Sequence, residues 1–377
     1  MRTIQVMNCK WYNATAWYVT YLTKILNQNN HESLLITLPH SIVSEQVKKL
    51  GVNYIELPLR ARTFSDFYTC YTEIKHICKE FKPDIVNCHR SENFLLWAYL
   101  KKQFDYKLVR TRGDQRLPKN TYLNKYIYQK FSDAFIVTNS RLKQYYQNEM
   151  DIAQSKIFTI LGGVDTQVFY PKNENRTLLR QELGFSDNDI VLGIIGRLDR
   201  VKGQFEAVEA FKKALSMDTN QDKILHLVFV GRESNFCMQE LKDFAIKLEL
   251  PEKQIHFFDY FNDINQFMNL LDVGVISSIG SEAIARVAFE MIACGIPIIG
   301  STVGVMPDIL EKDFMFSPAN IDEMARLFLQ VKDEDFRNRI CQSTNSRFRG
   351  TGDTHSIYGW TMDDFYQKTM AVYNTLV

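Results

Sequence analysis

The stretch Gly193–Phe211, GIIGRLDRVKGQFEAVEAF, joins a short apolar run to an amphipathic run through a loop that contains two glycines. The apolar residues at 190–195 predict a buried strand, and the residues from about Gln204 onward predict a helix. Arg197 and Lys202 lie in the loop between them. Ligands of open α/β sheets bind outside the carboxyl ends of the strands, so two cations here favour a diphosphate ligand. Solvated surface cations without a ligand are the alternative.

The same alternation of strand and helix runs through the chain and predicts two α/β domains with parallel, doubly wound sheets. The polar, glycine-containing stretch Leu161–Arg176 predicts a linker between them. We therefore expect one domain at 1–165, a second at 172–355, and a final helix at about 358–377 that packs back on the first. Strands are expected at 3–7, 33–38, 84–88, 107–111, 134–138 and 156–160, and at 190–195, 225–230, 254–258, 273–277 and 297–299.

A second stretch, Gly280–Gly300, GSEAIARVAFEMIACGIPIIG, predicts a helix over 282–294 that Ser281 caps and Gly295 ends. Glu282 would then lie in its first turn and Glu290 two turns later, within reach of one ligand. With Arg197 and Lys202 these carboxylates predict a site for diphosphate and sugar hydroxyls. The alternative is that Glu282 only complements the helix dipole and Glu290 faces solvent. Further expected contacts are the backbone at Ala283, Ile284 and Ala285, and the loop with Gly231 and Arg232 near a nucleotide base.

Bulk composition places the chain among ordinary globular proteins, with 45% hydrophobic residues over 377 positions. The start of the sequence does not resemble a signal peptide, and no apolar run reaches the ~18 residues of a membrane span. The seven cysteines are dispersed without CxxC spacing. We therefore expect a cytoplasmic protein without disulfides and without a metal site.

Charge is distributed unevenly along the chain. Residues 1–170 hold 23 Lys and Arg against 14 Asp and Glu, and residues 171–377 hold 22 against 30. The first half should therefore attract anionic partners. We expect this half to dock on the anionic inner face of the cell membrane. The residues that suggest this are the basic run at 110–130 and the aromatic residues Trp11, Tyr12 and Trp17. A solubilising surface is the alternative, and no feature predicts nucleic-acid binding.

The first domain offers weaker evidence for functional residues than the second. His89 follows an expected strand, where a functional histidine and a hydrogen-bonded loop histidine are equally expected. The loop at 8–21, NCKWYNATAWYVTY, carries five aromatic residues that form either core or a platform for a sugar or lipid-bearing acceptor. Arg112 and Asp114 follow the next strand.

The segments GRLDRVKG (196–203), VFVGRES (228–234) and SEAIARVAFEMIACGIPIIGSTVGVMPDIL (281–310) resemble the C-terminal domain of retaining family 4 glycosyltransferases, among them those that build bacterial cell-surface glycans and lipopolysaccharide. The linker GGVDTQVFYP (162–171) resembles the hinge of that family. The spacing of Glu282 and Glu290 matches its Glu-x7-Glu signature. The resemblance implies a GT-B fold, in which two Rossmann-like domains face one another across a cleft.

By the same resemblance, Arg197 and Lys202 hold the donor diphosphate, Glu290 holds the ribose, and Glu282 faces the transferred sugar. Two departures from the family matter. Ala283 stands where a glycine is common, and Gly113–Asp114 stands where His-Asp is common. We therefore assign catalytic roles to Asp114 and Arg112, and keep His89 as a candidate.

The expected activity is transfer of a sugar, with retention, from a nucleotide diphosphate donor to a hydroxyl of a glycan or glycolipid in polysaccharide or lipopolysaccharide biosynthesis. The nucleotide sugar is a co-substrate, and neither a cofactor nor a metal is expected. A nucleotide-sugar epimerase of the same fold and a non-catalytic glycan-binding protein are the alternatives.

Overall fold

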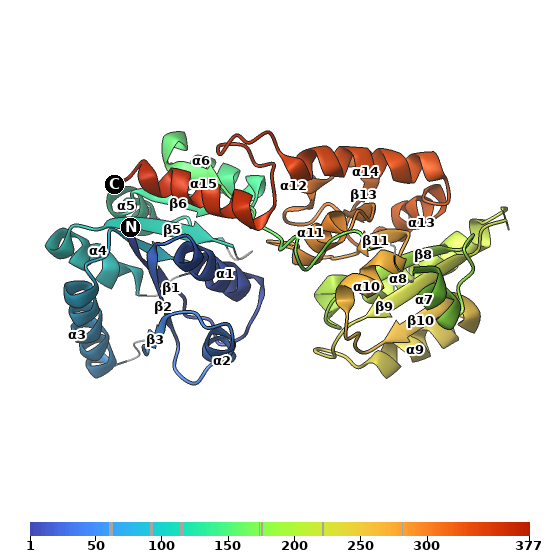
Figure 1. Ribbon diagram of the computed structural model, residues 1–377, viewed down its shortest axis with the longest axis horizontal. Coiled ribbons are helices and arrows are strands. Elements are labelled where there is room, and N and C mark those ends of the chain that lie inside the picture. The colour runs from blue at the N-terminus through green and yellow to red at the C-terminus, as the bar shows by residue number, and fades with distance from the viewer. Residues whose placement is uncertain are drawn as a thin grey trace. The chain divides into compact units, whose positions relative to one another are not determined.

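The computed structural model describes residues 1–59, 63–90, 93–113, 117–172, 174, 176–220, 222–280 and 282–377. These residues form two units, each built around one parallel sheet (Figure 1). The first unit comprises 1–162, 352–357 and 362–377, and the second comprises 163–351 and 358–361. Two parallel sheets with helices confirm the predicted α/β class.

The sheet of the first unit has the strand order β3-β2-β1-β4-β5-β6-β7, and all its pairings are parallel. The chain reverses its direction of progress between β1 and β4, as in doubly wound folds. The strands are β1 (Arg2–Val6), β2 (Glu32–Thr37), β3 (Tyr54–Glu56), β4 (Ile85–Cys88), β5 (Lys107–Arg112), β6 (Ala134–Val137) and β7 (Ile157–Thr159). The helices are α1 (Ala14–Gln28), α2 (Ile42–Lys49), α3 (Phe64–Phe81), α4 (Phe94–Phe104), α5 (Tyr122–Phe131), α6 (Ser140–Asn148) and α15 (Met362–Asn374).

The sheet of the second unit has the order β10-β9-β8-β11-β12-β13 and is also parallel. Its strands are β8 (Ile190–Ile195), β9 (Leu225–Val230), β10 (Ile255–Phe258), β11 (Val273–Ile276), β12 (Ile298–Ser301) and β13 (Met315–Phe316). Its helices are α7 (Arg176–Glu182), α8 (Gln204–Met217), α9 (Met238–Lys247), α10 (Ile264–Leu270), α11 (Arg286–Ala293), α12 (Met306–Ile309), α13 (Ile321–Gln330) and α14 (Glu334–Arg349). The helix expected from about Gln204 is confirmed.

A row of polar side chains lies buried on one face of the first sheet and is bonded to the C-terminal helix α15. The hydroxyl of Tyr373 accepts hydrogen bonds from the side-chain amides of Gln5 (3.3 Å) and Asn87 (2.9 Å). Thr111 donates to Asn87 Oδ1 at 2.8 Å. Burial raises the pKa of Tyr373 to about 12. Because each of these buried groups would be costly to leave unpaired, the network fixes α15 on β1 and β4.

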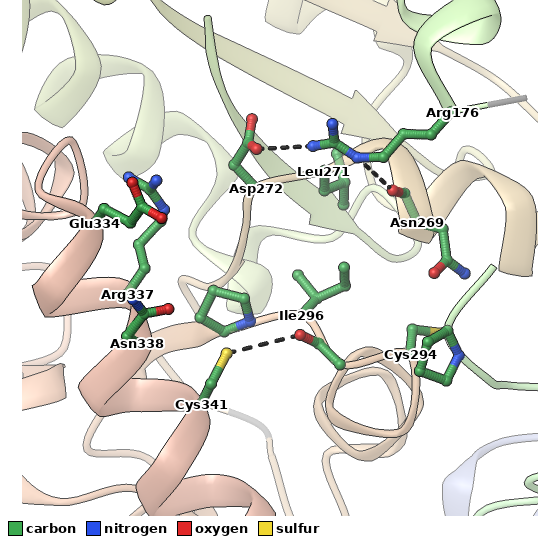
Figure 2. Close-up of a pocket in the computed structure, with 13 residues that line it drawn as sticks. Arg176, Asn269, Leu271, Asp272, Cys294, Ile296, Glu334, Arg337, Asn338 and Cys341 are labelled. Carbon is green, nitrogen blue, oxygen red and sulfur yellow. Dashed lines mark hydrogen bonds and ion pairs between the residues drawn. The ribbon is translucent and has the colours of Figure 1, made fainter. Parts of the chain in front are cut away.

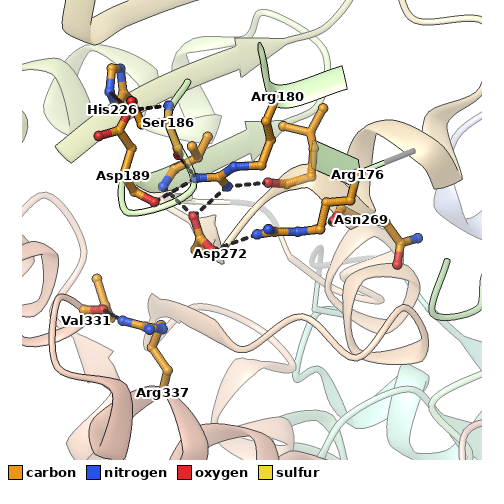
Figure 3. Close-up of polar contacts among 11 residues, drawn as sticks. Arg176, Arg180, Ser186, Asp189, His226, Asn269, Asp272, Val331 and Arg337 are labelled. Carbon is orange, nitrogen blue, oxygen red and sulfur yellow. Dashed lines mark hydrogen bonds and ion pairs between the residues drawn. The ribbon is translucent and has the colours of Figure 1, made fainter. Parts of the chain in front are cut away.

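A buried arginine joins the start of the second unit to its sheet (Figure 3). Arg180 on α7 is fully buried, and it donates to Asp272 Oδ2 at 2.9 Å and to the carbonyl oxygens of Ser186 and Asp189. Arg176 binds the other oxygen of Asp272 at 2.8 Å. Asp272 immediately precedes β11, so this network holds α7 against the amino edge of the sheet.

Candidate functional site

Two loops meet at the carboxyl edge of the second sheet, where the neighbouring strands β8 and β11 end. The backbone amides of Ile279 and Gly280 donate to the Val201 carbonyl oxygen at 2.9 and 3.3 Å. The Ser277 hydroxyl donates to the Lys202 carbonyl oxygen at 2.8 Å. At Gly203, where φ is +69°, a Cβ would lie 2.1 Å from the Ser277 carbonyl oxygen, so the approach of the loops requires glycine.

Lys202 and Glu282 are brought together by these loops. The Lys202 ammonium binds Glu282 Oε1, and the Ser278 hydroxyl donates to the same oxygen at 2.5 Å. Glu282 is only 7% exposed. Its carboxylate is therefore held by two groups in a largely desolvated position, where electrostatic interactions are stronger than in bulk water. Ser278 was not singled out from the sequence, although its place two residues after a strand end is a usable signal.

Arg197 and the loop after β9 border the same edge. Arg197 binds Asp199 Oδ2 at 2.6 Å, and the buried Asp199 also accepts from Asn235 at 2.8 Å. The side chain of Arg197 is 55% exposed and therefore accessible to a ligand. A Cβ at Gly231 would lie 1.7 Å from the Gly196 carbonyl oxygen, so the loop after β9 can approach only with glycine there. The Arg232 guanidinium lies 5.4 Å from the ring centre of Tyr260.

The prediction that a helix begins at 282 is wrong, because α11 begins at Arg286. Ala285 has φ of +43°, a left-handed conformation that cannot continue a helix. The Glu282 carbonyl oxygen accepts from Val305 N at 2.8 Å, although a helix over 282–294 would direct it to the amide of residue 286. Glu282 therefore lies in the loop before α11. The predicted cap Ser281 lies outside the described residues, and Ile284 and Ala285 are buried in the same loop.

Glu290 lies one turn into α11, and the alternative that it faces solvent is wrong. Its side chain is 11% exposed, and Arg286 Nη2 donates to its Oε1 at 2.8 Å. Burial raises the pKa of the Glu290 carboxyl, and the neighbouring Arg286 partly opposes this. A buried carboxylate with one oxygen bonded to a cation retains its second oxygen for a hydroxyl donor.

The candidates of the first unit do not converge in the same way. His89 is fully buried, and its Nε2 lies 2.9 Å from Gln5 Oε1, beside the polar row that binds Tyr373. Burial lowers its pKa to about 3, so the ring is neutral at pH 7. This geometry favours the hydrogen-bonded histidine over a functional one. Arg112 is 6% exposed at the end of β5, and Asp114 lies outside the described residues.

The aromatic loop after β1 divides between core and surface. Asn13 caps α1 by accepting from Ala16 N at 3.0 Å, and the Thr15 hydroxyl donates to the Gly113 carbonyl oxygen at 3.1 Å. Trp17 is buried, whereas Trp11 is exposed. Trp17 therefore belongs to the core, and the exposed Trp11 does not.

A cavity of about 320 Å³ lies at the opposite edge of the second sheet, before β11 and β12 (Figure 2). Arg176, Asp272 and Arg337 are among its lining residues. The arginines are already bonded within the protein, Arg176 to Asp272 and Arg337 to the Val331 carbonyl oxygen at 2.7 Å. No candidate residue of the carboxyl edge lines this cavity. Within the described part of the chain, no group of three or more His, Cys, Asp and Glu side chains is placed to hold a metal ion.

Glycosyltransferase family models match both halves of the chain. Residues 15–168 match the model described as Glycosyltransferase Family 4, and residues 175–347 match the model described as Glycosyl transferases group 1. Spore coat protein SA of Bacillus subtilis is 31% identical over 48% of this chain, which spans about half (50%) of that relative's length. N-acetyl-alpha-D-glucosaminyl L-malate synthase of Bacillus anthracis is 25% identical over 78% of this chain and 76% of its own.

A solved structure shares the fold over the whole chain. The crystal structure of HepE from Anabaena in complex with UDP has a TM-score of 0.82 with this chain and covers 100% of both chains. Its sequence identity is 16%, so the likeness concerns the fold alone.

Proposed function

Because this chain belongs to the GT-B glycosyltransferases, we propose that it transfers a sugar from a nucleotide diphosphate donor to a hydroxyl of a glycan or glycolipid, with retention at the anomeric carbon. The proposal places the donor on the second unit and the acceptor on the first. It takes the reaction to be part of cell-surface polysaccharide or lipopolysaccharide biosynthesis. The enzyme would work in the cytoplasm without a metal or a resident cofactor.

The observation that carries the proposal is the pairing of Lys202 with Glu282 at the carboxyl edge of the second sheet, with the exposed Arg197 on the same loop as Lys202. Negative charge grows on the diphosphate as the bond to the sugar breaks, and fixed cations stabilise it without reorganisation. Lys202 and Arg197 are proposed to supply these charges. Glu282 and Glu290 are proposed to accept from sugar and ribose hydroxyls respectively.

The proposed reaction exchanges one C–O bond for another. The bond between the anomeric carbon and the diphosphate oxygen breaks, and the acceptor hydroxyl oxygen bonds to the same carbon. The acceptor proton passes to the departing phosphate on the same face of the sugar. This route needs no strong protein base, so Asp114 and Arg112 are proposed to position the acceptor or to stabilise the cationic sugar.

A thermal-shift screen of nucleotide sugars tests the donor assignment. A ligand at about 100 times its dissociation constant adds about 2.7 kcal/mol to the free energy of unfolding. We expect one class of nucleotide diphosphate sugar to raise the melting temperature, and the matching free sugar to leave it unchanged. A specific donor site would be contradicted if every nucleotide sugar raised the melting temperature equally, or if none raised it.

The membrane surface expected from the sequence loses three of its residues to the protein interior. Arg110 and Arg112 are buried, and Arg110 packs against the rings of Phe94 and Tyr128. Trp17 is buried as well. These residues therefore cannot contact a membrane, although the positive charge of residues 1–170 includes both arginines.

Exposed aromatic residues also gather on α3 and α4, where the ring centres of Tyr71 and Tyr99 lie 6.2 Å apart. Phe64 on α3 is 84% exposed and Tyr99 on α4 is 68% exposed. Lys79 and Lys102 are exposed on the same two helices, and so are Glu73 and Glu80. We propose this α3–α4 face as the membrane-docking surface that gives access to a lipid-linked acceptor. No helix in the described ranges is long and apolar enough to cross a membrane.

Sedimentation with vesicles tests this surface. Each Lys or Arg near an anionic membrane contributes about 1 kcal/mol, so binding to anionic vesicles should exceed binding to neutral vesicles. It should weaken between 0.1 M and 1 M salt, where the Debye length falls from about 10 Å to about 3 Å. Phe64→Ser with Tyr99→Ser should reduce it, and Ile246→Ser, an exposed control on the second unit, should not. Equal binding to both vesicle types would contradict the proposal.

A further inference from the structure

A cavity of about 520 Å³ lies in the first unit, at the carboxyl ends of the neighbouring strands β1, β2 and β3. Loops after these strands supply its lining residues, which include Lys10, Trp11, Pro39, His40, Ile42 and Pro58. The volume lies within the ~300–1,000 Å³ of small-molecule sites. None of the residues proposed to hold the donor lines this cavity.

The charge of the lining is positive. Lys10 and His40 are the ionisable residues among the described lining residues, and none of that group is acidic. Both are exposed, and no described residue forms an ion pair or a hydrogen bond with the side chain of Lys10. The first residue of α2, Ile42, also borders the cavity, so the positive end of that helix dipole adds to the field. The cavity therefore favours an anionic group.

An aromatic face is held in place beside these two basic side chains. The Trp11 carbonyl oxygen accepts from the Cys9 thiol at 3.1 Å and from Asn13 N at 3.0 Å, which fixes the backbone of this residue. Its side chain nevertheless remains 70% exposed. A fixed backbone with an exposed indole ring presents a flat surface on which the apolar face of a sugar ring can stack.

The other walls of the cavity are also fixed by internal bonds. The Ser41 hydroxyl donates to the Leu38 carbonyl oxygen at 2.9 Å, and the Cys70 thiol donates to the Pro58 carbonyl oxygen at 3.0 Å. His40 has φ of +50°, a left-handed conformation that residues other than glycine seldom adopt. The surrounding bonds hold this histidine at the cavity.

We infer that this cavity is the acceptor subsite and that it binds a sugar ring carrying an anionic substituent, a carboxylate or a phosphate. The inference rests on the proposed sugar transfer. Trp11 stacks on the ring, and Lys10 and His40 bind the anion. A charge-assisted hydrogen bond contributes about 1.5–3 kcal/mol, so the anionic group should strengthen binding by about 10-fold or more over a neutral ring.

Tryptophan fluorescence offers a direct test, because Trp11 differs from the other three tryptophans. Trp17 is 6% exposed, and Trp97 and Trp360 are fully buried. Acrylamide quenching therefore reports mainly on Trp11. We expect methyl β-D-glucuronide or glucose 6-phosphate to protect Trp11 from acrylamide, and methyl β-D-glucoside to need about 10-fold higher concentrations. Preference for one of the two anionic probes distinguishes a carboxylate from a phosphate.

Substitutions test which residues of the cavity bind the probes. Lys10→Gln should weaken binding of the anionic probes about 10-fold and leave binding of the glucoside unchanged. Lys247→Gln, which changes an exposed lysine on α9, should affect neither. His40→Asn should act like Lys10→Gln, since asparagine also tolerates positive φ. Trp11→Phe should abolish the signal. Equal protection by anionic and neutral probes, or no protection by any, would overturn the inference.

Binding of uridine and guanosine diphosphates, measured by calorimetry on the same samples, separates this inference from the proposed function. Diphosphate binding without protection of Trp11 would overturn the subsite and leave the donor assignment intact. Protection of Trp11 by the anionic probes without diphosphate binding would overturn the donor assignment and support the subsite.

Discussion

Replacing Lys202 by alanine is expected to lower the rate of sugar transfer by about 10²- to 10³-fold, the usual loss when one preorganised charge-stabilising group is removed. The structure adds a second consequence. Lys202 is the cation bound to the largely buried Glu282, so its removal also leaves that carboxylate without its ion pair. The effect should appear in turnover measured at saturating donor concentration.

Two further variants make this result specific. Lys213→Ala also removes a lysine from an ion pair of the second unit, the exposed pair with Asp322, and should leave turnover unchanged. The double variant Lys202→Ala with Glu282→Gln should lose less turnover, expressed as free energy, than the sum of the two single losses. The effects of substituting residues in contact are generally not additive. Near wild-type turnover in Lys202→Ala would contradict the diphosphate assignment.

Glu282→Gln is expected to lower turnover by about 10- to 10²-fold with a small change in the apparent donor constant. A hydrogen bond to a charged group contributes about 1.5–3 kcal/mol, and the hydroxyls facing Glu282 are proposed to lie beside the reacting carbon. Glutamine keeps the shape of the side chain and one acceptor oxygen. The loss therefore measures charge more than packing.

Glu290→Gln provides the matched comparison, since Glu290 is also a buried carboxylate bound to a cation, Arg286. Its proposed partner is the ribose, which does not change during the reaction. The apparent donor constant should therefore rise by about 10-fold while turnover is maintained. Steady-state kinetics of both variants checks these roles. The assignment would be contradicted if Glu290→Gln lowered turnover and Glu282→Gln raised the donor constant.

Central strands were predictable from the sequence, and two of the four edge strands, β3 and β13, were not. β8 and β9 carry continuous apolar runs because both faces are buried, and their predicted bounds are confirmed. β3 has three residues and an exposed central position, and β13 has two residues. β3 and β13 lack both the length and the periodicity on which strand prediction depends.

The pairing of loops in the candidate site was more predictable than its local backbone. Strand order alone places the loops with Lys202 and Glu282 at one edge, and the structure brings the two side chains into contact. The start of α11 depends on a bond between Glu282 and Val305, which are far apart in sequence. Likewise, burial of Arg110 depends on stacking against Phe94 and Tyr128, which charge counting does not detect.

The central claim is that the protein transfers a sugar from a nucleotide diphosphate donor. Proton and carbon NMR tests it most directly, in a reaction whose donor is labelled at the anomeric carbon. The donor would be the nucleotide sugar with the largest thermal shift, and the acceptor a glycoside that protects Trp11 from acrylamide. The labelled carbon is expected to appear in a new glycosidic bond with the anomeric configuration of the donor, and this signal should be lost in Lys202→Ala. A product of opposite configuration, or an epimerised nucleotide sugar without a glycoside, would contradict the account.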